Sequence, residues 1–154
     1  MKTDNIQQAL EKAMALCSRS EKCRSEIDQK LATWGISSGS DREKILNRLI
    51  DDNFLNERRY ASNYVTDKHR LNRWGKIKIR MMLKSKSIPE EIIKEALSGI
   101  SDQDYIDLLR EELKNKKRTT KSKNQFDMKG KLFRFAASKG YEYDLIYLVI
   151  DELE

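Results

Sequence analysis

The sequence contains only one histidine, one proline and two cysteines among its 154 residues. A single histidine excludes most zinc sites and most general-base arrangements. The phosphate loop G-x-x-x-x-G-K-[ST] and the nucleophile motif G-x-S-x-G are also absent. Glu112 and Lys114 form an E-x-K pair of the kind nucleases carry on strands, but the segment is helical and no partner carboxylate is placed beside it. We therefore expect no enzymatic activity, no cofactor and no metal site.

Long apolar runs are absent as well. No stretch approaches the ~20 apolar residues that a membrane-spanning helix needs, and residues 1–10 are polar, unlike a signal peptide. Cys17 and Cys23 are six residues apart, which places them on different faces of a helix, so we interpret them as reduced thiols. These features predict a soluble cytoplasmic protein, with a monomer as the default state.

The composition favours a folded helical protein. Charged residues make up 36% of the chain and hydrophobic residues 38%, with many Lys, Glu, Leu and Ile. A chain of this length can form one core of moderate size or a few small cores in series. We predict an all-α protein.

The net charge of +6 is concentrated in the middle of the chain. Residues 1–53 hold nine basic and nine acidic side chains, and residues 101–154 hold eleven of each. Residues 54–100 hold eleven basic and only five acidic side chains. Residues 68–86 contain eight Lys or Arg and no acid, and residues 114–131 contain eight with one acid. Patches of this density attract polyanions.

Apolar residues recur at helical spacing along nearly the whole chain. We expect nine helices. Seven are indicated by apolar residues at helical spacing or by their expected bounds, at residues 6–17, 27–34, 45–50, 60–65, 76–85, 101–117 and 132–136. A further helix starts at residue 89, and the last lies around residues 145–150.

Several residues predict where these helices begin and end. Gly35 can end the second helix, because glycine accepts the left-handed conformation of a C-terminal stop. Ser40 and Glu43 form an S-x-x-E capping box that predicts the start of the third helix after a loop at residues 37–40. Pro89 suits the first turn of the sixth helix. Residues 116–124 contain no apolar residue and predict a mobile basic loop.

The chain also contains a degenerate repeat of about fifty residues. Leu31, Leu83 and Ala136 are 52 and 53 residues apart. Four residues after each stands Gly or Ser, followed by an apolar residue: Gly35 and Ile36, Ser87 and Ile88, Gly140 and Tyr141. This register predicts three tandem three-helix units at residues 1–53, 54–100 and 101–154, forming an elongated, curved array.

These residues resemble a known family. The segment FLNERRYASNYV at residues 54–65, then Gly75, then I-x-x-x-L at Ile79 and Leu83, is similar to the middle unit of RecX, the regulatory protein of the RecA recombinase. E-I-x-x-K-L at residues 26–31 and KLFRFAASKGY at residues 131–141 resemble the first and third units. The resemblance covers about residues 9–152. It departs from the family pattern at Cys23, at residues 56–57, at Ser87, where glycine is usual, and at Ala136.

The resemblance implies three tandem three-helix repeats and a non-enzymatic modulator of RecA. Family members bind along the groove of the RecA filament on single-stranded DNA. They generally suppress strand exchange, ATP hydrolysis and filament growth, in DNA repair, homologous recombination and the SOS response. The implied partners are the RecA filament and the single-stranded DNA within it.

The stretch RWGKIKIRMMLKSKSI at residues 73–88 has two interpretations. Its basic flank is either a solvated rim, with Ile77 and Met81 packed on a neighbouring unit, or a contact surface for a polyanion or filament. The resemblance favours the contact surface. The candidate filament and DNA-binding residues are Arg58, Arg70, Arg73, Lys76, Arg80, Lys84, Lys117, Arg118, Lys121, Lys131 and Arg134.

Other residues are assigned structural roles. Trp74 could stack on a base, but beside a glycine at a helix start we expect it to fill a core or a junction between units. Arg59 could grip a phosphate or pair with an acid on the third helix. Tyr60 and Tyr64 are expected in the core, and His69 on the surface amid basic residues.

Two other functional classes stay open from the residues alone. A direct DNA-binding helical protein would bind DNA tightly, with steep salt dependence, in the absence of a recombinase. A plain helical adaptor would use its basic stripe only for solubility. A RecX-like regulator would instead bind DNA weakly and depend on the filament.

Overall fold

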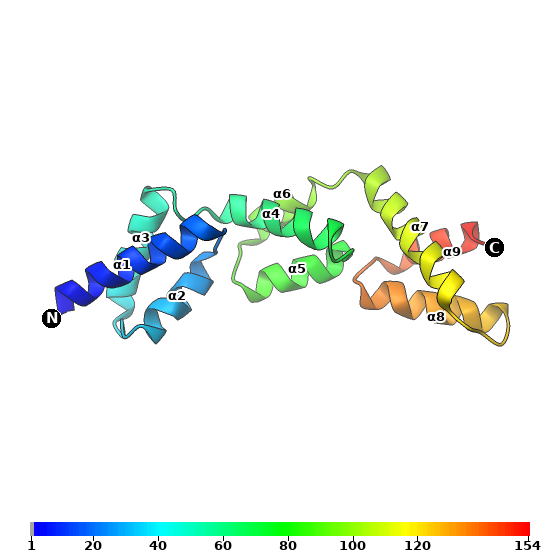
Figure 1. Ribbon diagram of the computed structural model, residues 1–154. Helices are drawn as coiled ribbons and strands as arrows, with labels where there is room; N and C mark the ends of the chain where they lie inside the picture. The colour runs from blue at the N-terminus through cyan, green and yellow to red at the C-terminus, as the bar shows by residue number, and fades with distance from the viewer. Residues whose placement is uncertain (1) are drawn as a thin grey trace.

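The computed structural model describes residues 2–154, with side chains from residue 3 onward, and in this range it contains nine helices and no strand (Figure 1). The helices are α1 (Lys2–Arg19), α2 (Arg24–Thr33), α3 (Gly39–Asp51), α4 (Glu57–Arg70), α5 (Lys76–Ser85), α6 (Glu90–Leu97), α7 (Asp102–Thr119), α8 (Gln125–Ser138) and α9 (Tyr143–Glu152). The predicted all-α class is confirmed. In the described range no helix combines the length and the apolar character needed to cross a membrane.

The helices form three successive groups of three along an elongated molecule, with the two chain ends at opposite extremes (Figure 1). We refer to α1–α3, α4–α6 and α7–α9 as the first, second and third units. All helix pairs with extensive contacts lie within one unit, and each unit has its own hydrophobic core. The unit boundaries at residues 53 and 100 remain a prediction. Two buried residues pack across the first boundary: Leu55 lies in the first core and Cys23 in the second.

The middle helix of each unit ends with the same backbone motif. Gly35, the predicted stop, and its repeat counterparts Ser87 and Gly140 all adopt a left-handed conformation, with φ of 95°, 62° and 95°. In each case the N–H of the next residue donates to a carbonyl five residues earlier, the bond that closes a Schellman motif. These bonds are Ile36 to Leu31 (3.0 Å), Ile88 to Leu83 (3.2 Å) and Tyr141 to Ala136 (3.2 Å). The repeat register predicted from the sequence therefore matches the structure.

The predicted start of the third helix is wrong by two residues. Ser38, not Ser40, is the N-cap of α3, and its hydroxyl accepts a hydrogen bond from the N–H of Asp41 at 3.3 Å. Ser40 lies inside the helix, and Glu43 pairs with Arg24 instead of capping. The polar run SSGSD offers two serines with an acid three residues later, and local sequence does not distinguish between them.

The predicted basic loop at residues 116–124 is also partly wrong, because α7 continues to Thr119. Cations in the last turn interact favourably with the C-terminal end of a helix. Two of them gain further contacts: Lys116 Nζ lies 4.9 Å from the centre of the Phe135 ring, and Lys117 Nζ donates to the Leu153 carbonyl at 2.8 Å. Only residues 120–124 connect α7 to α8.

The second and third units are joined by the first turn of α5. Its N–H groups have no partners within the helix, and the third unit supplies them. The N–H of Gly75 donates to the Lys139 carbonyl at 2.7 Å, and that of Ile77 donates to the Gly140 carbonyl at 3.0 Å. The N–H of Lys76 donates to the Tyr105 hydroxyl at 2.9 Å. The N-terminus of α5 is thus capped by the two residues that follow α8 and by a side chain of α7.

This junction requires two glycines. A Cβ atom on Gly75 would overlap the Gly140 carbonyl, and a Cβ atom on Gly140 would overlap the backbone of Lys78. Gly140 also has a positive φ, which glycine adopts without steric cost. The Tyr141 hydroxyl completes the junction by donating to the Arg73 carbonyl at 3.1 Å.

The first and second units meet in the same relative arrangement, but through side chains. The N-terminus of α2 faces the end of α5, where the Ser25 hydroxyl donates to the Lys86 carbonyl at 2.7 Å. The N–H of Arg24 donates to Glu57 at 3.4 Å. Arg59 Nε donates to Glu21 Oε1 at 2.5 Å. The expected acid partner for Arg59 on the third helix is therefore wrong, because the partner lies between α1 and α2, at the junction.

The two cysteines of the described chain are free thiols, and Cys23 is fully buried. Burial raises the pKa of both Cys17 and Cys23. A thiol with a raised pKa is less often a thiolate, so both side chains are poor nucleophiles.

Replacing Gly75 with alanine should open the junction between the second and third units. Losing the two backbone bonds, at about 1 kcal/mol each, should speed hydrogen exchange of the Ile77 amide about 30-fold. Gly130→Ala is the matched control, because this helical Cβ would approach only the end of the Arg134 side chain. Unchanged Ile77 exchange in Gly75→Ala would show that the junction does not depend on the close approach.

Gly35→Ala should destabilise the first unit by about 1 kcal/mol in urea unfolding. Space is not the reason, since nothing lies within 4 Å of an added Cβ; the cost is the positive φ. Gly39→Ala lies in a helical turn with similar space and should leave stability unchanged or raise it slightly. Equal stabilities of the two variants would contradict this explanation of the helix stop.

Candidate functional site

Several of the predicted binding residues are paired with carboxylates. Arg58 pairs with Glu95, Arg73 with Glu111 and Glu112 at 3.5 and 3.4 Å, Arg80 and Lys84 both with Glu90, and Lys131 with Asp127 at 3.3 Å. Lys84 lies 3.4 Å from its partner oxygen. Such surface pairs add little stability, but the acid cancels much of the positive potential that a polyanion would meet. The flank of α5 formed by Arg80 and Lys84 is therefore less positive than its sequence indicates.

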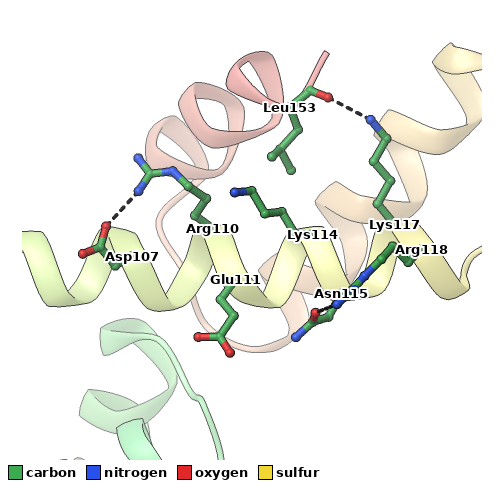
Figure 2. A pocket seen from close by; sticks show the side chains of 8 residues that line it. All are labelled: Asp107, Arg110, Glu111, Lys114, Asn115, Lys117, Arg118 and Leu153. Atoms are coloured by element: carbon green, nitrogen blue, oxygen red, sulfur yellow. Dashed lines mark hydrogen bonds and ion pairs between the residues drawn. The ribbon is translucent and has the colours of Figure 1, made fainter.

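Two predicted binding residues at the end of α7, Lys117 and Arg118, line a shallow hollow of mixed charge (Figure 2). Arg110 contacts Asp107 at 2.8 Å, and Lys117 reaches the Leu153 carbonyl. Arg118 bonds to Asn115 within the same helix. The lining combines Arg110, Lys114, Lys117 and Arg118 with the acids Asp107 and Glu111, so the hollow offers no uniformly positive surface for a polyanion.

Four basic residues around the turn between α4 and α5 form a different environment. Lys68, Arg70, Lys76 and Lys78 have no carboxylate within ion-pair distance among the described side chains. Arg70 is exposed, and Lys76 Nζ lies 4.7 Å from the centre of the Tyr105 ring. We call these four residues, together with Trp74, the α4–α5 cluster. The other candidates without a carboxylate partner are exposed and lie in the third unit: Lys117, Arg118, Lys121 and Arg134.

Trp74 organises two of these lysines. Lys68 Nζ lies 5.0 Å and Lys78 Nζ 4.5 Å from the centre of the Trp74 ring, and Lys68 also lies 5.4 Å from the centre of the Tyr64 ring. Both distances to Trp74 fall in the range of cation–π attraction. The indole is partly buried and packs against the second core, as expected of a structural residue. Sequence reasoning had not selected Lys68 or Lys78, although the spacing of two lysines on either side of a tryptophan was available as a signal.

The backbone of this turn is held in place at several points. The N–H of Trp74 donates to the Lys68 carbonyl at 3.0 Å, and Lys139 Nζ donates to the Asn72 carbonyl at 3.0 Å. Arg73 has a φ of 59°, a left-handed conformation that is uncommon outside glycine. Its carbonyl accepts the Tyr141 hydroxyl bond described above. The cluster therefore sits on a backbone that the third unit fixes.

His69 supports the same turn and is buried, so the expected surface position is wrong. The side chain is 6% exposed, and its ring packs 5.5 Å from the Tyr105 ring. Nδ1 lies 3.0 Å from the Trp74 carbonyl. Because a carbonyl only accepts, Nδ1 must carry the proton. The helical spacing from the buried residues Ala61 and Val65, at i+8 and i+4, was the signal for its position.

The outer face of α5 is apolar and open. Ile77 is 48% exposed and Met81 62% exposed, whereas Ile79 and Leu83 are fully buried. The interpretation that Ile77 and Met81 pack against a neighbouring unit is therefore wrong. The first turn of α5 also offers no N–H groups at residues 75–77 for an anion, since the third unit occupies them.

Comparison with known proteins places the whole chain in one family. Family models match at residues 56–97, as the second three-helix domain of RecX, and at residues 102–150, as the third. The chain is 34% identical to the regulatory protein RecX of Clostridium botulinum (strain Alaska E43 / Type E3), over 97% of this chain and 70% of that protein. It is 35% identical to the regulatory protein RecX of Vibrio campbellii, over 88% and 85% of the two chains.

Solved structures agree with these relatives. The crystal structure of RecX from Lactobacillus salivarius is 27% identical and superposes with a TM-score of 0.81, covering 98% of this chain and 97% of that one. A second crystal structure, of a regulatory protein RecX, has a TM-score of 0.88 at 21% identity and supports the fold. With two domain models covering more than half of the residues and relatives matched over nearly its whole length, the chain belongs to the RecX family of non-enzymatic regulatory proteins.

Proposed function

We propose that this protein binds in the groove of a RecA filament on single-stranded DNA and inhibits the recombinase and its ATP hydrolysis. The observation that carries the proposal is the elongated array of three units, joined by hydrogen bonds at both junctions. An array of this shape suits an extended groove, and fixed junctions lower the entropic cost of contacting it at several points. Excess positive charge in the second unit, between two units of balanced charge, supports a partner that contains nucleic acid.

Titrating the protein into RecA on single-stranded DNA should lower the rate of ATP hydrolysis. Inhibition is expected at protein concentrations where binding to the same bare DNA, recorded at the same salt, is still low. Unchanged hydrolysis together with tight binding to bare DNA would reject the proposal and identify a direct DNA-binding protein.

Opening the junction between the second and third units should weaken inhibition. If contacts to the filament are spread over the array, Gly75→Ala should need about tenfold more protein for half-inhibition, because the units must be ordered on binding. Gly130→Ala should inhibit like the parent protein, and circular dichroism would verify that both variants retain their helices. Full inhibition by Gly75→Ala, with fast Ile77 exchange, would place the essential contacts within one unit.

A further inference from the structure

The α4–α5 cluster differs from the rest of α5 in its lack of neutralising carboxylates. Arg80 and Lys84, one to two turns further along α5, share Glu90. The acids on the facing part of α7, Glu111 and Glu112, are engaged by Arg73, and Glu112 also lies 3.6 Å from Lys139. Around Trp74, therefore, positive charge remains without a carboxylate to cancel it.

Trp74 lies close to two of these charges. The ammonium groups of Lys68 and Lys78 both lie within 5.0 Å of the centre of the same ring. Like charges repel, and a bound anion would offset the repulsion between these two ammonium groups. Because the ring already restrains both side chains, little rotamer entropy remains to be lost when the anion binds.

The composition of the cluster favours a nucleic-acid strand as the source of the anion. Basic side chains interleaved with aromatic rings are typical of proteins that bind single strands, where charge follows the backbone and rings contact bases. Arg70 and Lys76 extend the positive charge on either side of Trp74 in the sequence. The N-terminus of α5 cannot bind a phosphate through the N–H groups of residues 75–77, because these groups donate to the third unit.

We propose that the α4–α5 cluster binds the phosphate backbone of single-stranded nucleic acid, with Lys68 and Lys78 contacting phosphates beside Trp74. This inference deepens the proposed function and rests on it in one respect: the strand is then the one inside the filament. The contact itself does not require RecA and is accessible to test with a bare strand.

The probe is oligothymidylate, followed by tryptophan fluorescence. The described residues contain two tryptophans, and Trp34 belongs to the first unit, where Lys12 lies 5.5 Å from its ring centre. In a Trp34→Phe background the remaining emission reports on Trp74 alone. Addition of oligothymidylate at low salt should change that emission saturably, and the affinity should fall as salt rises.

The decisive variant is Lys68→Gln with Lys78→Gln. It should bind oligothymidylate about tenfold more weakly at 0.1 M salt, and its plot of log affinity against log salt should be flatter by about 1.4. Arg80→Gln with Lys84→Gln removes the same charge from the same surface and should weaken binding by no more than about threefold, because Glu90 already offsets one of these two charges. Lys68→Arg with Lys78→Arg should retain binding.

The remaining outcomes separate this inference from the proposed function. Equal weakening by the two glutamine pairs, no weakening by Lys68→Gln with Lys78→Gln, or no response of the parent protein to the strand would overturn the inference. If that variant binds the strand normally but no longer inhibits ATP hydrolysis, the cluster contacts an acidic protein surface, and only the inference fails. If the parent protein binds the strand as expected but leaves hydrolysis unchanged, the proposed function fails and the inference stands.

Discussion

The close approach of Gly75 to Gly140 is the contact on which the arrangement of the second and third units depends. A helix begins with N–H groups that need partners, and it ends with carbonyl groups that need them too. Here the end of one helix satisfies the start of another: the carbonyls of Lys139 and Gly140, directly after α8, accept the N–H groups at the start of α5. Because no side chain separates the two backbones, the relative position of the units is set by hydrogen-bond geometry.

The same contact determines where positive charge is presented. The turn between α4 and α5 is bonded to the third unit through the carbonyls of Asn72 and Arg73, and His69 fixes Trp74 from inside the second unit. Trp74 then restrains Lys68 and Lys78. This turn therefore has both a structural and a binding role. Variants of Gly75 are expected to change the position of the second unit relative to the third, whereas variants of Lys68 and Lys78 are expected to change only the charge presented at the turn.

Most of the fold could be predicted from the sequence, since helical periodicity and the stops at Gly35 and Gly140 are local properties. Errors arose where local signals competed, as in the two serines before α3, or where a helix continued past its predicted end, as α7 does to Thr119. The binding surface was harder to predict. The basic residues of α5 look equivalent in the sequence, but Arg80 is close to an acid of α6 and Lys78 is not.

Residues close together in the chain specify the helices, the fifty-residue register and the excess of charge in the second unit, so these features can be read from the amino-acid order. Folding alone establishes which of those charges are cancelled, that His69 is buried, and that Gly75 faces Gly140. Those properties depend on residues 65 positions apart or on neighbouring helices meeting in space, and neither periodicity nor composition specifies which side chains then become neighbours.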